Sequence, residues 1–222
     1  MKIHAQIKQG THEWHERRLG KITGSEVYKY ITPATYKMSS ECINKNVYDL
    51  IGKERVDYDE NDKAEFSSIP SYIAERGHAG EGEVRFWYQE ESFEQVTEVG
   101  FIESDCGNCG FSPDGIVTNG FIEIKTVNSA FLMKAKHQNS LQDYIHKESK
   151  GKYWLQILLG FYINPDFKFC DFILYCSSLK EMNERFFLER IERPTEELEK
   201  FSKGIADVIE LKNKIKNELF NK

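Results

Sequence analysis

The chain has 222 residues, of which 40% are hydrophobic and 30% are charged, with a formal net charge of −6. This composition argues against a disordered or membrane-embedded chain and favours one globular domain over residues 1–222. The negative charge argues against a protein that coats nucleic acid unspecifically, because such binding depends on lysine and arginine side chains neutralising phosphates. It does not exclude an enzyme whose site must be acidic to hold metal ions.

The thiols and the amino terminus indicate the compartment. The five cysteines are an odd number without the spacing of a disulfide framework, so we expect reduced thiols. The first residues lack the apolar run of a secretory signal, and no stretch approaches the roughly 18–20 apolar residues that a membrane span needs. We therefore expect a cytoplasmic protein that does not contact a membrane.

The amino-terminal part is predicted to be mainly helical. Residues 12–31 favour two short helices, the second opened by the capping-box pattern Thr23-Gly24-Ser25-Glu26, which places Ser25 in its first turn. Residues 41–56 favour another helix, and the polar stretch 57–71 favours a mobile loop.

A long helix and several strands are predicted next. From Ile73 to Tyr88, apolar residues and glycines recur at helical spacing, and Glu81 falls on the same stripe. Further along the chain we predict strands at 97–104 and 111–126, a buried helix at 153–163, strands at 167–176 and 185–192, and a terminal helix at about 195–220. This order predicts a mixed α/β domain with a central mixed sheet flanked by helices.

The segment from Ser112 to Lys125 is the most informative part of the sequence. Asn119-Gly120 predicts a two-residue hairpin turn that pairs Asp114 with Lys125. Because side chains alternate along a strand, Asp114, Glu123 and Lys125 are expected on one face of the hairpin. The other face carries the apolar side chains that can enter the core, Val117, Ile122 and Ile124.

These three charged side chains suit phosphodiester hydrolysis. Two carboxylates within about 7–8 Å across a strand pair can share a hard divalent cation. A neighbouring lysine can orient or deprotonate water, or offset the charge of the phosphate. A solvent-exposed hairpin face with a surface salt bridge produces the same pattern, so the interpretation needs support from other residues.

Four residues outside the hairpin provide that support. Glu81 occupies a core-facing position of its helix, where an unpaired carboxylate is costly. Gln156 interrupts the apolar run 153–159. Arg18 and Ser25 lie near a predicted helix amino terminus, where a guanidinium and backbone amides suit a phosphate. Each also has a purely structural interpretation: a polar residue at the edge of a stripe, a core amide bonded to the backbone, or a surface arginine.

Taken together, these positions resemble the phage lambda exonuclease family, or YqaJ-like viral recombinases, within the PD-(D/E)xK nuclease superfamily. The resemblance extends from about Trp14 to the start of the last helix. Five short pieces carry it in the family's order and approximate spacing: Trp14-His15-Glu16-Arg17-Arg18-Leu19-Gly20 followed by Ile22-Thr23-Gly24-Ser25-Glu26-Val27, Arg76-Gly77 with Glu81, Ser112-Pro113-Asp114-Gly115, Glu123-Ile124-Lys125, and Gln156.

The resemblance implies a metal site with two Mg²⁺ ions per active site, for which Mn²⁺ can substitute. Asp114, Glu123 and the main-chain carbonyl of Ile124 resemble its ligands, and Glu81 resembles an acid that helps to bind the second metal or its waters. Lys125 resembles the catalytic lysine that positions the attacking water.

The resemblance also implies a substrate and partners. Gln156 resembles a glutamine that orients the nucleophile or the lysine. Arg18 and Ser25 resemble a pocket that captures a 5′-phosphate, which implies digestion of one strand of linear double-stranded DNA in the 5′ to 3′ direction. The 3′ single-stranded tails would serve recombination with a phage-type annealing protein, in the cytoplasm of a bacterial host.

Family members form a ring-shaped homotrimer around a tapered channel. The stretch Lys134–Lys152 could line such a channel or form a solvated basic loop. We find no match between Asp57 and Ser71 to the family's strand-separating residues.

Two other functions remain open. A PD-(D/E)xK endonuclease of restriction or repair type has no need of a terminal-phosphate pocket. A catalytically degenerate DNA-binding module has no need of the intact pair of acids and lysine. Cys106-Gly107-Asn108-Cys109 lacks the second ligand pair of a zinc site, and we interpret it as a turn.

Overall fold

The computed structural model of the chain describes residues 1–62 and 71–220, with side chains described for 1–62 and 80–220. No helix in this part of the chain is long and apolar enough to cross a membrane. In chain order, the elements are β1 (Lys2–His4), α1 (His12–Arg18), β2 (Ile22–Thr23), a 3₁₀ helix (Val27–Lys29), a π-helical segment (Cys42–Asn46), α2 (Val47–Lys53), α4 (Ser71–Ser92), β3 (Phe101–Glu103), β4 (Cys109–Phe111), β5 (Gly115–Val117), β6 (Gly120–Thr126), α5 (Ser129–Gln138), a second π-helical segment (Tyr144–Glu148), α6 (Lys152–Ile163), β7 (Phe169–Tyr175), a 3₁₀ helix (Met182–Glu184), β8 (Phe186–Glu192) and α7 (Glu196–Phe220).

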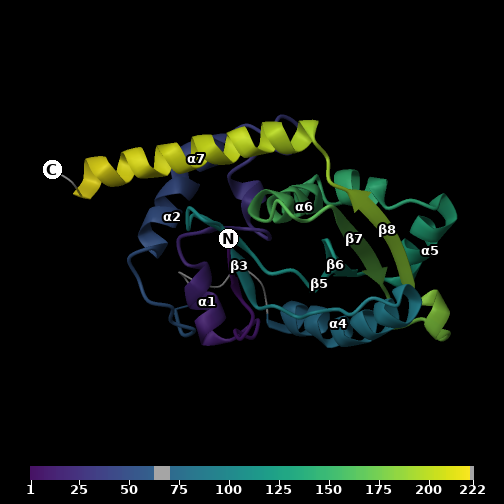
Figure 1. The fold of residues 1–222 in the computed structure, drawn as a ribbon. Coiled ribbons are helices and arrows are strands. Elements are labelled where there is room, and N and C mark those ends of the chain that lie inside the picture. The colour runs from purple at the N-terminus through teal and green to yellow at the C-terminus, as the bar shows by residue number, and fades with distance from the viewer. Residues whose placement is uncertain (63–70, 221–222) are drawn as a thin grey trace.

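The strands form two four-stranded sheets, both of them mixed (Figure 1). In the first sheet the order is β1-β3-β4-β2, and only β2 and β4 run parallel. In the second the order is β5-β6-β7-β8, with β6 and β7 parallel and the outer pairs antiparallel. Mixed sheets flanked by helices confirm the predicted fold class.

Alternation along β6 assigns its side chains to two cores. Ile122 and Ile124 pack with Val84 of α4 on one face of the second sheet. Phe121 packs on the other face, where its ring meets that of Phe161 of α6 edge to face at 5.3 Å. Because side chains alternate in a strand, Glu123 and Lys125 of β6 share the α6 face with Phe121.

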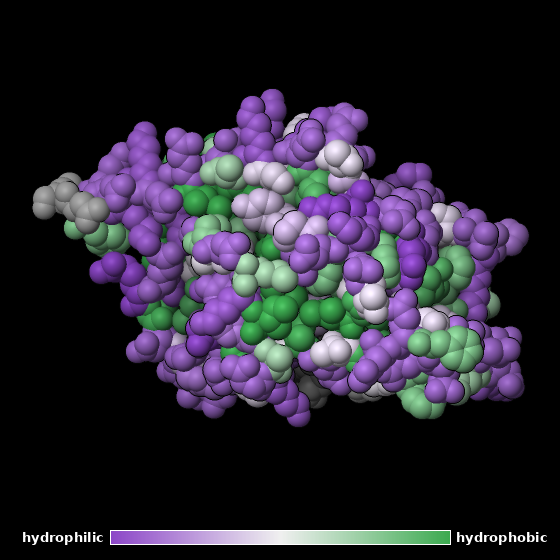
Figure 2. All heavy atoms as spheres, viewed as in Figure 1, coloured by the Kyte–Doolittle hydropathy of each residue, from purple (hydrophilic) through white to green (hydrophobic). Residues whose placement is uncertain are grey.

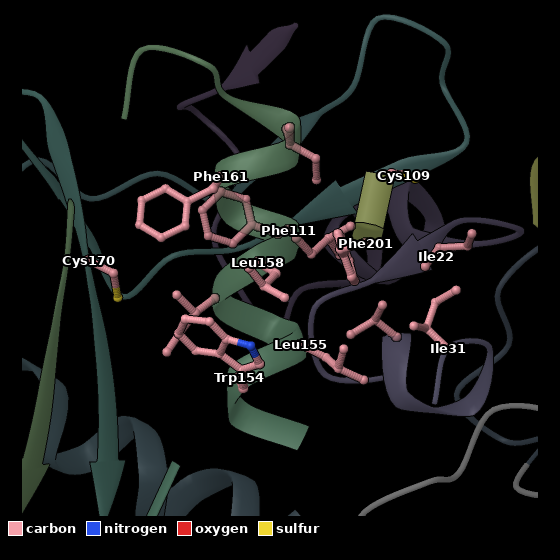
Figure 3. Packing of buried hydrophobic residues seen from close by; sticks show 14 of the residues in the cluster. Ile22, Ile31, Cys109, Phe111, Trp154, Leu155, Leu158, Phe161, Cys170 and Phe201 are labelled. Atoms are coloured by element: carbon pink, nitrogen blue, oxygen red, sulfur yellow. The ribbon is translucent and has the colours of Figure 1, made fainter. Parts of the chain in front are cut away.

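The helix α6 lies at the centre of the larger core, with side chains from several elements around it (Figure 3). It is buried over most of its length, as its continuous apolar run predicts. Gly160 allows the close approach, since a Cβ there would lie 2.8 Å from the ring of Phe121. The terminal helix α7 adds the apolar stripe predicted for it, which is Leu198, Phe201, Ile205 and Val208.

The surface is mostly hydrophilic on the face shown in Figure 2. Apolar residues gather in a band across the middle of this face, between α7 above and α4 below (Figures 1 and 2). The two long helices lie on opposite sides of the molecule in this view, α4 against β6 and α7 against α2 and α6 (Figure 1).

The predicted second helix within residues 12–31 is wrong. Ile22 and Thr23 instead form β2, which pairs parallel with β4, and the Ile22 amide donates to the carbonyl of Asn108 at 2.9 Å. Ser25 follows in a turn closed by the Glu26 amide, which donates to the Thr23 carbonyl at 3.0 Å. Only a 3₁₀ helix comes after it, because pairing with β4 takes the capping residue into a strand.

The predicted hairpin turn is also displaced by one residue. Val117 pairs with Gly120, so the turn residues are Thr118 and Asn119, and Asn119 adopts the left-handed conformation at φ 62°. Gly120 lies inside the strand, where a Cβ would come within 2.5 Å of the ring of Phe169. The glycine therefore serves close packing against β7, and the turn uses the asparagine.

The structure also bears on the predictions for residues 134–152, 41–56 and 57–71. The loop interpretation of Lys134–Lys152 is wrong, because α5 and the second π-helical segment occupy most of it, anchored by the buried Leu132, Ala135 and Ile145. The predicted helix at 41–56 is confirmed in its central part. Of the predicted loop 57–71, residues 63–70 lie outside the described residues.

Candidate active site

Glu123 stands at the centre of a polar cluster between β6 and α6. Its Oε1 accepts a hydrogen bond from Gln156 Nε2 at 2.6 Å and forms an ion pair with Lys125 Nζ. The Lys125 ammonium also lies 4.9 Å from the centroid of the Tyr153 ring, an attractive cation–π arrangement. Two donors therefore fix one oxygen of Glu123, and α6 orients the lysine.

Asp114 reaches this cluster from the bend before β5. Its Oδ2 accepts a hydrogen bond from the Ile124 amide at 2.6 Å. The N–H and C=O of one strand residue point to the same side, so the Ile124 carbonyl also lies on the Asp114 side of β6. The carbonyl of Asp114 accepts from Arg85 Nη1 at 3.0 Å, which ties the bend to α4.

Glu81 approaches from α4. Its side chain is 16% exposed, and its Oε2 lies 3.4 Å from Arg85 Nη1. Its negative charge contributes to raising the pKa of both Asp114 and Glu123. The structure therefore brings the acid of α4 close to Asp114 and Glu123, on the inner side of α4 as the stripe predicts.

The electrostatics of the cluster are those of crowded carboxylates. Loss of hydration raises the pKa of Asp114 well above its ordinary value, and the charge of Glu123 raises it further. Burial also raises the pKa of Glu123, although Lys125 acts against this shift. Burial by itself lowers the pKa of Lys125, but the charges of Glu123 and Asp114 outweigh it and raise that pKa. The lysine is therefore held protonated.

One atom of the cluster has no partner within the described residues. Glu123 Oε2 is buried and makes no hydrogen bond there. A buried carboxylate oxygen without a donor is costly, whereas carboxylate and carbonyl oxygens are ligands that hard divalent cations prefer. No group of three or more His, Cys, Asp and Glu side chains in the described part of the chain is arranged to hold a metal. The oxygens available to such a cation here are those of Asp114 and Glu123 and the Ile124 carbonyl.

Arg18 and Ser25 meet beside β2. Arg18 Nη2 donates to Ser25 Oγ at 3.0 Å and to Thr23 Oγ1 at 3.3 Å, and its guanidinium lies 4.2 Å from the ring centroid of Trp14. Burial lowers the pKa of Arg18 to about 10, and Glu26 partly offsets this. Within the described residues no carboxylate lies within ion-pair distance of Arg18. A guanidinium whose hydrogen bonds go only to hydroxyl groups can still bind a phosphate by donating to its oxygens.

Gln156 connects this pocket to the acidic cluster. A Cβ at Gly24 would lie 3.2 Å from Gln156 Cγ, so the Thr23–Ser25 turn packs directly on the glutamine. The same glutamine donates to Glu123. Gln156 therefore contacts both groups of residues.

Several residues of this site escaped the sequence-based reasoning. Trp14 Nε1 donates to Ser112 Oγ at 2.8 Å and so ties α1 to the bend before Asp114. Arg85 stands four residues after Glu81, and this spacing on a helix could have indicated that the two side chains form an ion pair. Arg76 and Gly77 of the matched pieces lie in α4, and their side chains fall outside the described residues.

A mixed sheet flanked by helices, with two acids and a lysine meeting beside a strand, defines a core of the PD-(D/E)xK type. The model of the YqaJ-like viral recombinase domain matches residues 13–163. The chain belongs to this family. No curated protein matches the chain.

Solved structures agree with this assignment. An alkaline exonuclease from Laribacter hongkongensis is 26% identical and superposes with a TM-score of 0.67, over 94% of this chain and 98% of its own. The same exonuclease in complex with dAMP is 27% identical, with a TM-score of 0.66 and the same coverage. A phage-related exonuclease from Haemophilus somnus 129PT, 12% identical with a TM-score of 0.64 over 90% of this chain and 96% of its own, shares the fold.

Proposed function

We propose that the protein is a metal-dependent exonuclease that degrades one strand of linear double-stranded DNA from 5′-phosphorylated ends, in the 5′ to 3′ direction. The products would be 3′ single-stranded tails for recombination by strand annealing. The observation that carries the proposal is the contact of Gln156 with Glu123 on one side and Gly24 on the other. This contact supports the proposal that the acidic cluster and the Arg18–Ser25 pocket act as parts of one site.

Asp114, Glu123 and the Ile124 carbonyl would hold the metal, with Glu81 contributing to a second metal or its waters. The partnerless Glu123 Oε2 supports this assignment, because a cation would compensate its buried charge. Bound there, Mg²⁺ or Mn²⁺ would stabilise the negative charge that develops on the attacking and leaving oxygens of the phosphate.

Lys125 and Gln156 would act on the attacking water and the phosphate. The charges of Glu123 and Asp114 raise the pKa of Lys125 and favour its ammonium form, which can donate a hydrogen bond to the water or the phosphate. Gln156 Nε2 is engaged with Glu123, so its role is to hold that carboxylate and, through it, Lys125.

Arg18 and Ser25 would bind the terminal phosphate. The buried guanidinium and the exposed hydroxyl can both donate to phosphate oxygens, and a phosphate can be bound bidentately by arginine. An enzyme that anchors a terminal phosphate beside its cleavage site starts at ends, which distinguishes it from an endonuclease.

One assay tests the end-directed reaction. The protein is incubated with Mg²⁺ or with chelator, on matched linear and covalently closed duplexes, the linear ones with 5′-phosphate or 5′-hydroxyl. We expect degradation of the linear 5′-phosphorylated duplex, and only with Mg²⁺. Closed circles degraded as fast as linear DNA would contradict the proposal.

Two variants of α1 test the phosphate pocket in the same assay. Arg18→Gln should reduce the preference for 5′-phosphorylated ends. Arg17→Gln is the matched control, because Arg17 is an exposed neighbour on the same helix. Equal effects of the two changes would remove the assignment of the pocket.

A further variant separates binding from chemistry. Lys125→Ala should retain binding to DNA ends, measured by fluorescence anisotropy, and lose cleavage by about 100-fold or more. A wild-type cleavage rate in this variant would refute the role of the lysine.

We propose, from the resemblance to the family, that the subunits form a homotrimer. Size-exclusion chromatography with light scattering measures the mass directly. A monomer at micromolar concentration would contradict the ring arrangement.

A further inference from the structure

The turn between β3 and β4 carries two cysteines that the proposed nuclease reaction does not use. The Gly107 amide donates to the Ser104 carbonyl at 2.9 Å, and Gly107 adopts φ +71°. The Ser104 amide donates to the Cys109 carbonyl at 3.0 Å and closes the turn. The turn therefore contains an exposed cysteine, Cys106, and ends at a fully buried one, Cys109.

The surroundings of the Cys106 sulfur favour its thiolate. Ser104 Oγ lies 3.3 Å from this sulfur and also bonds the amide and the carbonyl of Cys109 at 3.1 Å, so one serine connects the two cysteines. The hydrogen bond from Cys109, with smaller contributions from Ser104 and Asn108, outweighs burial and lowers the pKa of Cys106 to about 4. The same hydrogen bond raises the pKa of Cys109, so the buried thiol keeps its proton. The thiolate is the form of cysteine that attacks disulfides.

Cys106 is also accessible to a small molecule. It lies in the wall of an open groove of about 520 Å³ between α6 and α7. Besides Cys106, the lining residues include Tyr162, Ile209, Glu210 and Asn213. The other three cysteines, Cys42, Cys170 and Cys176, are buried.

We propose that Cys106 and Cys109 form a thiol–disulfide exchange pair that reacts with low-molecular-weight disulfides of the glutathione class. In the first step the Cys106 thiolate attacks one sulfur of the reagent, whose S–S bond breaks and releases one thiolate. In the second, Cys109 transfers its proton to the thiolate released in the first step and attacks the Cys106 sulfur, whose bond to the reagent sulfur breaks and expels a second thiolate. The two protein sulfurs are oxidised to one disulfide, and the reagent disulfide is reduced to one thiol and one thiolate, which takes its proton from water.

The pair is distinct from a zinc site and from the nuclease site. Within the described residues it has no third His, Cys, Asp or Glu ligand that would complete a metal site. Neither cysteine contacts the acidic cluster, so the proposal does not depend on the proposed nuclease activity.

Mass spectrometry of the native full-length protein tests the proposal. The protein is treated with oxidised glutathione, free thiols are blocked by an alkylating agent, and peptides are mapped. We expect a disulfide between Cys106 and Cys109 that dithiothreitol reverses, while the three buried cysteines stay reduced. A glutathione adduct that remains on Cys106 of the wild-type protein, or an unreacted pair, would overturn the proposal.

Variants distinguish the two steps. Cys109→Ala should stop at a stable glutathione adduct on Cys106, and Cys106→Ser should not react at all. Cys176→Ser is the matched control and should form the disulfide as the wild type does. Circular dichroism checks that each variant folds, and the Cys106→Ser change, at an exposed position, keeps the test valid if the buried changes do not fold.

The pH dependence gives an independent readout. Alkylation of Cys106 by iodoacetamide should keep nearly the same rate from about pH 6 to pH 8, because its thiolate is already formed. An ordinary thiol slows about tenfold for each pH unit below its pKa. A tenfold fall per pH unit at Cys106 would overturn the proposal.

Discussion

Replacing Asp114 by Asn should inactivate the protein and stabilise its metal-free form. The amide is almost the same size as the carboxylate, and its oxygen can still accept the hydrogen bond from the Ile124 amide. What the change removes is a negative charge beside Glu123. Loss of a metal ligand should cost several kcal/mol of transition-state stabilisation, or about 100-fold or more in rate.

The stability effect follows from the pKa of Asp114. The fold raises this pKa well above its ordinary value of 3.8, through loss of hydration and the charge of Glu123. Above pH 3.8 the folded protein therefore binds a proton that the unfolded chain releases, and wild-type stability falls as pH rises until the folded pKa is passed. A tenfold difference in proton affinity between the folded and unfolded chains corresponds to about 1.4 kcal/mol of lost stability, and the Asn variant avoids this loss.

Thermal unfolding in chelator, at a series of pH values, measures the effect. For a chain of this size, about 1.4 kcal/mol changes the Tm by roughly 3–6 °C. The Tm of Asp114→Asn should exceed that of the wild type by an amount that grows above pH 4 and then levels off. Added Mg²⁺ should raise the Tm of the wild type and leave that of the variant nearly unchanged. A Tm difference that does not depend on pH would refute the reasoning.

Two further changes test the packing at the site and on the opposite face of the second sheet. Gly24→Ala should displace Gln156, whose Cγ would lie 3.2 Å from the new methyl group, and reduce the cleavage rate by roughly tenfold. Gly52→Ala, where no atom lies within 4 Å, is the control and should keep the wild-type rate. Arg190→Ala should destabilise the fold by about 2 kcal/mol in urea titrations, because it removes the guanidinium that bonds the buried Asp171 at 2.7 and 2.8 Å and leaves only the Tyr88 hydroxyl of the described side chains as a donor to this carboxylate. A smaller loss in the double variant Arg190→Ala, Asp171→Asn would support that explanation, whereas an equal or larger loss would contradict it.

The sequence by itself determined the features that depend on local periodicity. Glu123 and Lys125 share a face because they stand two residues apart on one strand, and a shift of the hairpin turn cannot change this. The helices α4, α6 and α7 follow from apolar patterns that repeat within a single segment. The grouping of Asp114 with these residues was also predictable, although the register places Asp114 opposite Glu123 and not opposite Lys125 as predicted. A shift of two residues keeps every side chain on the same face of the hairpin.

Only the tertiary structure decided which local preference prevailed where two segments meet. Gly120 begins β6 instead of forming the turn, and its lack of a Cβ leaves room for the ring of Phe169. Thr23 lies in a strand because its backbone pairs with that of β4. The contact of Gln156 with Gly24, and the partnerless oxygen of Glu123, likewise depend on elements far apart in the chain. Such contacts are formed by packing between segments, and no pattern within one segment contains them.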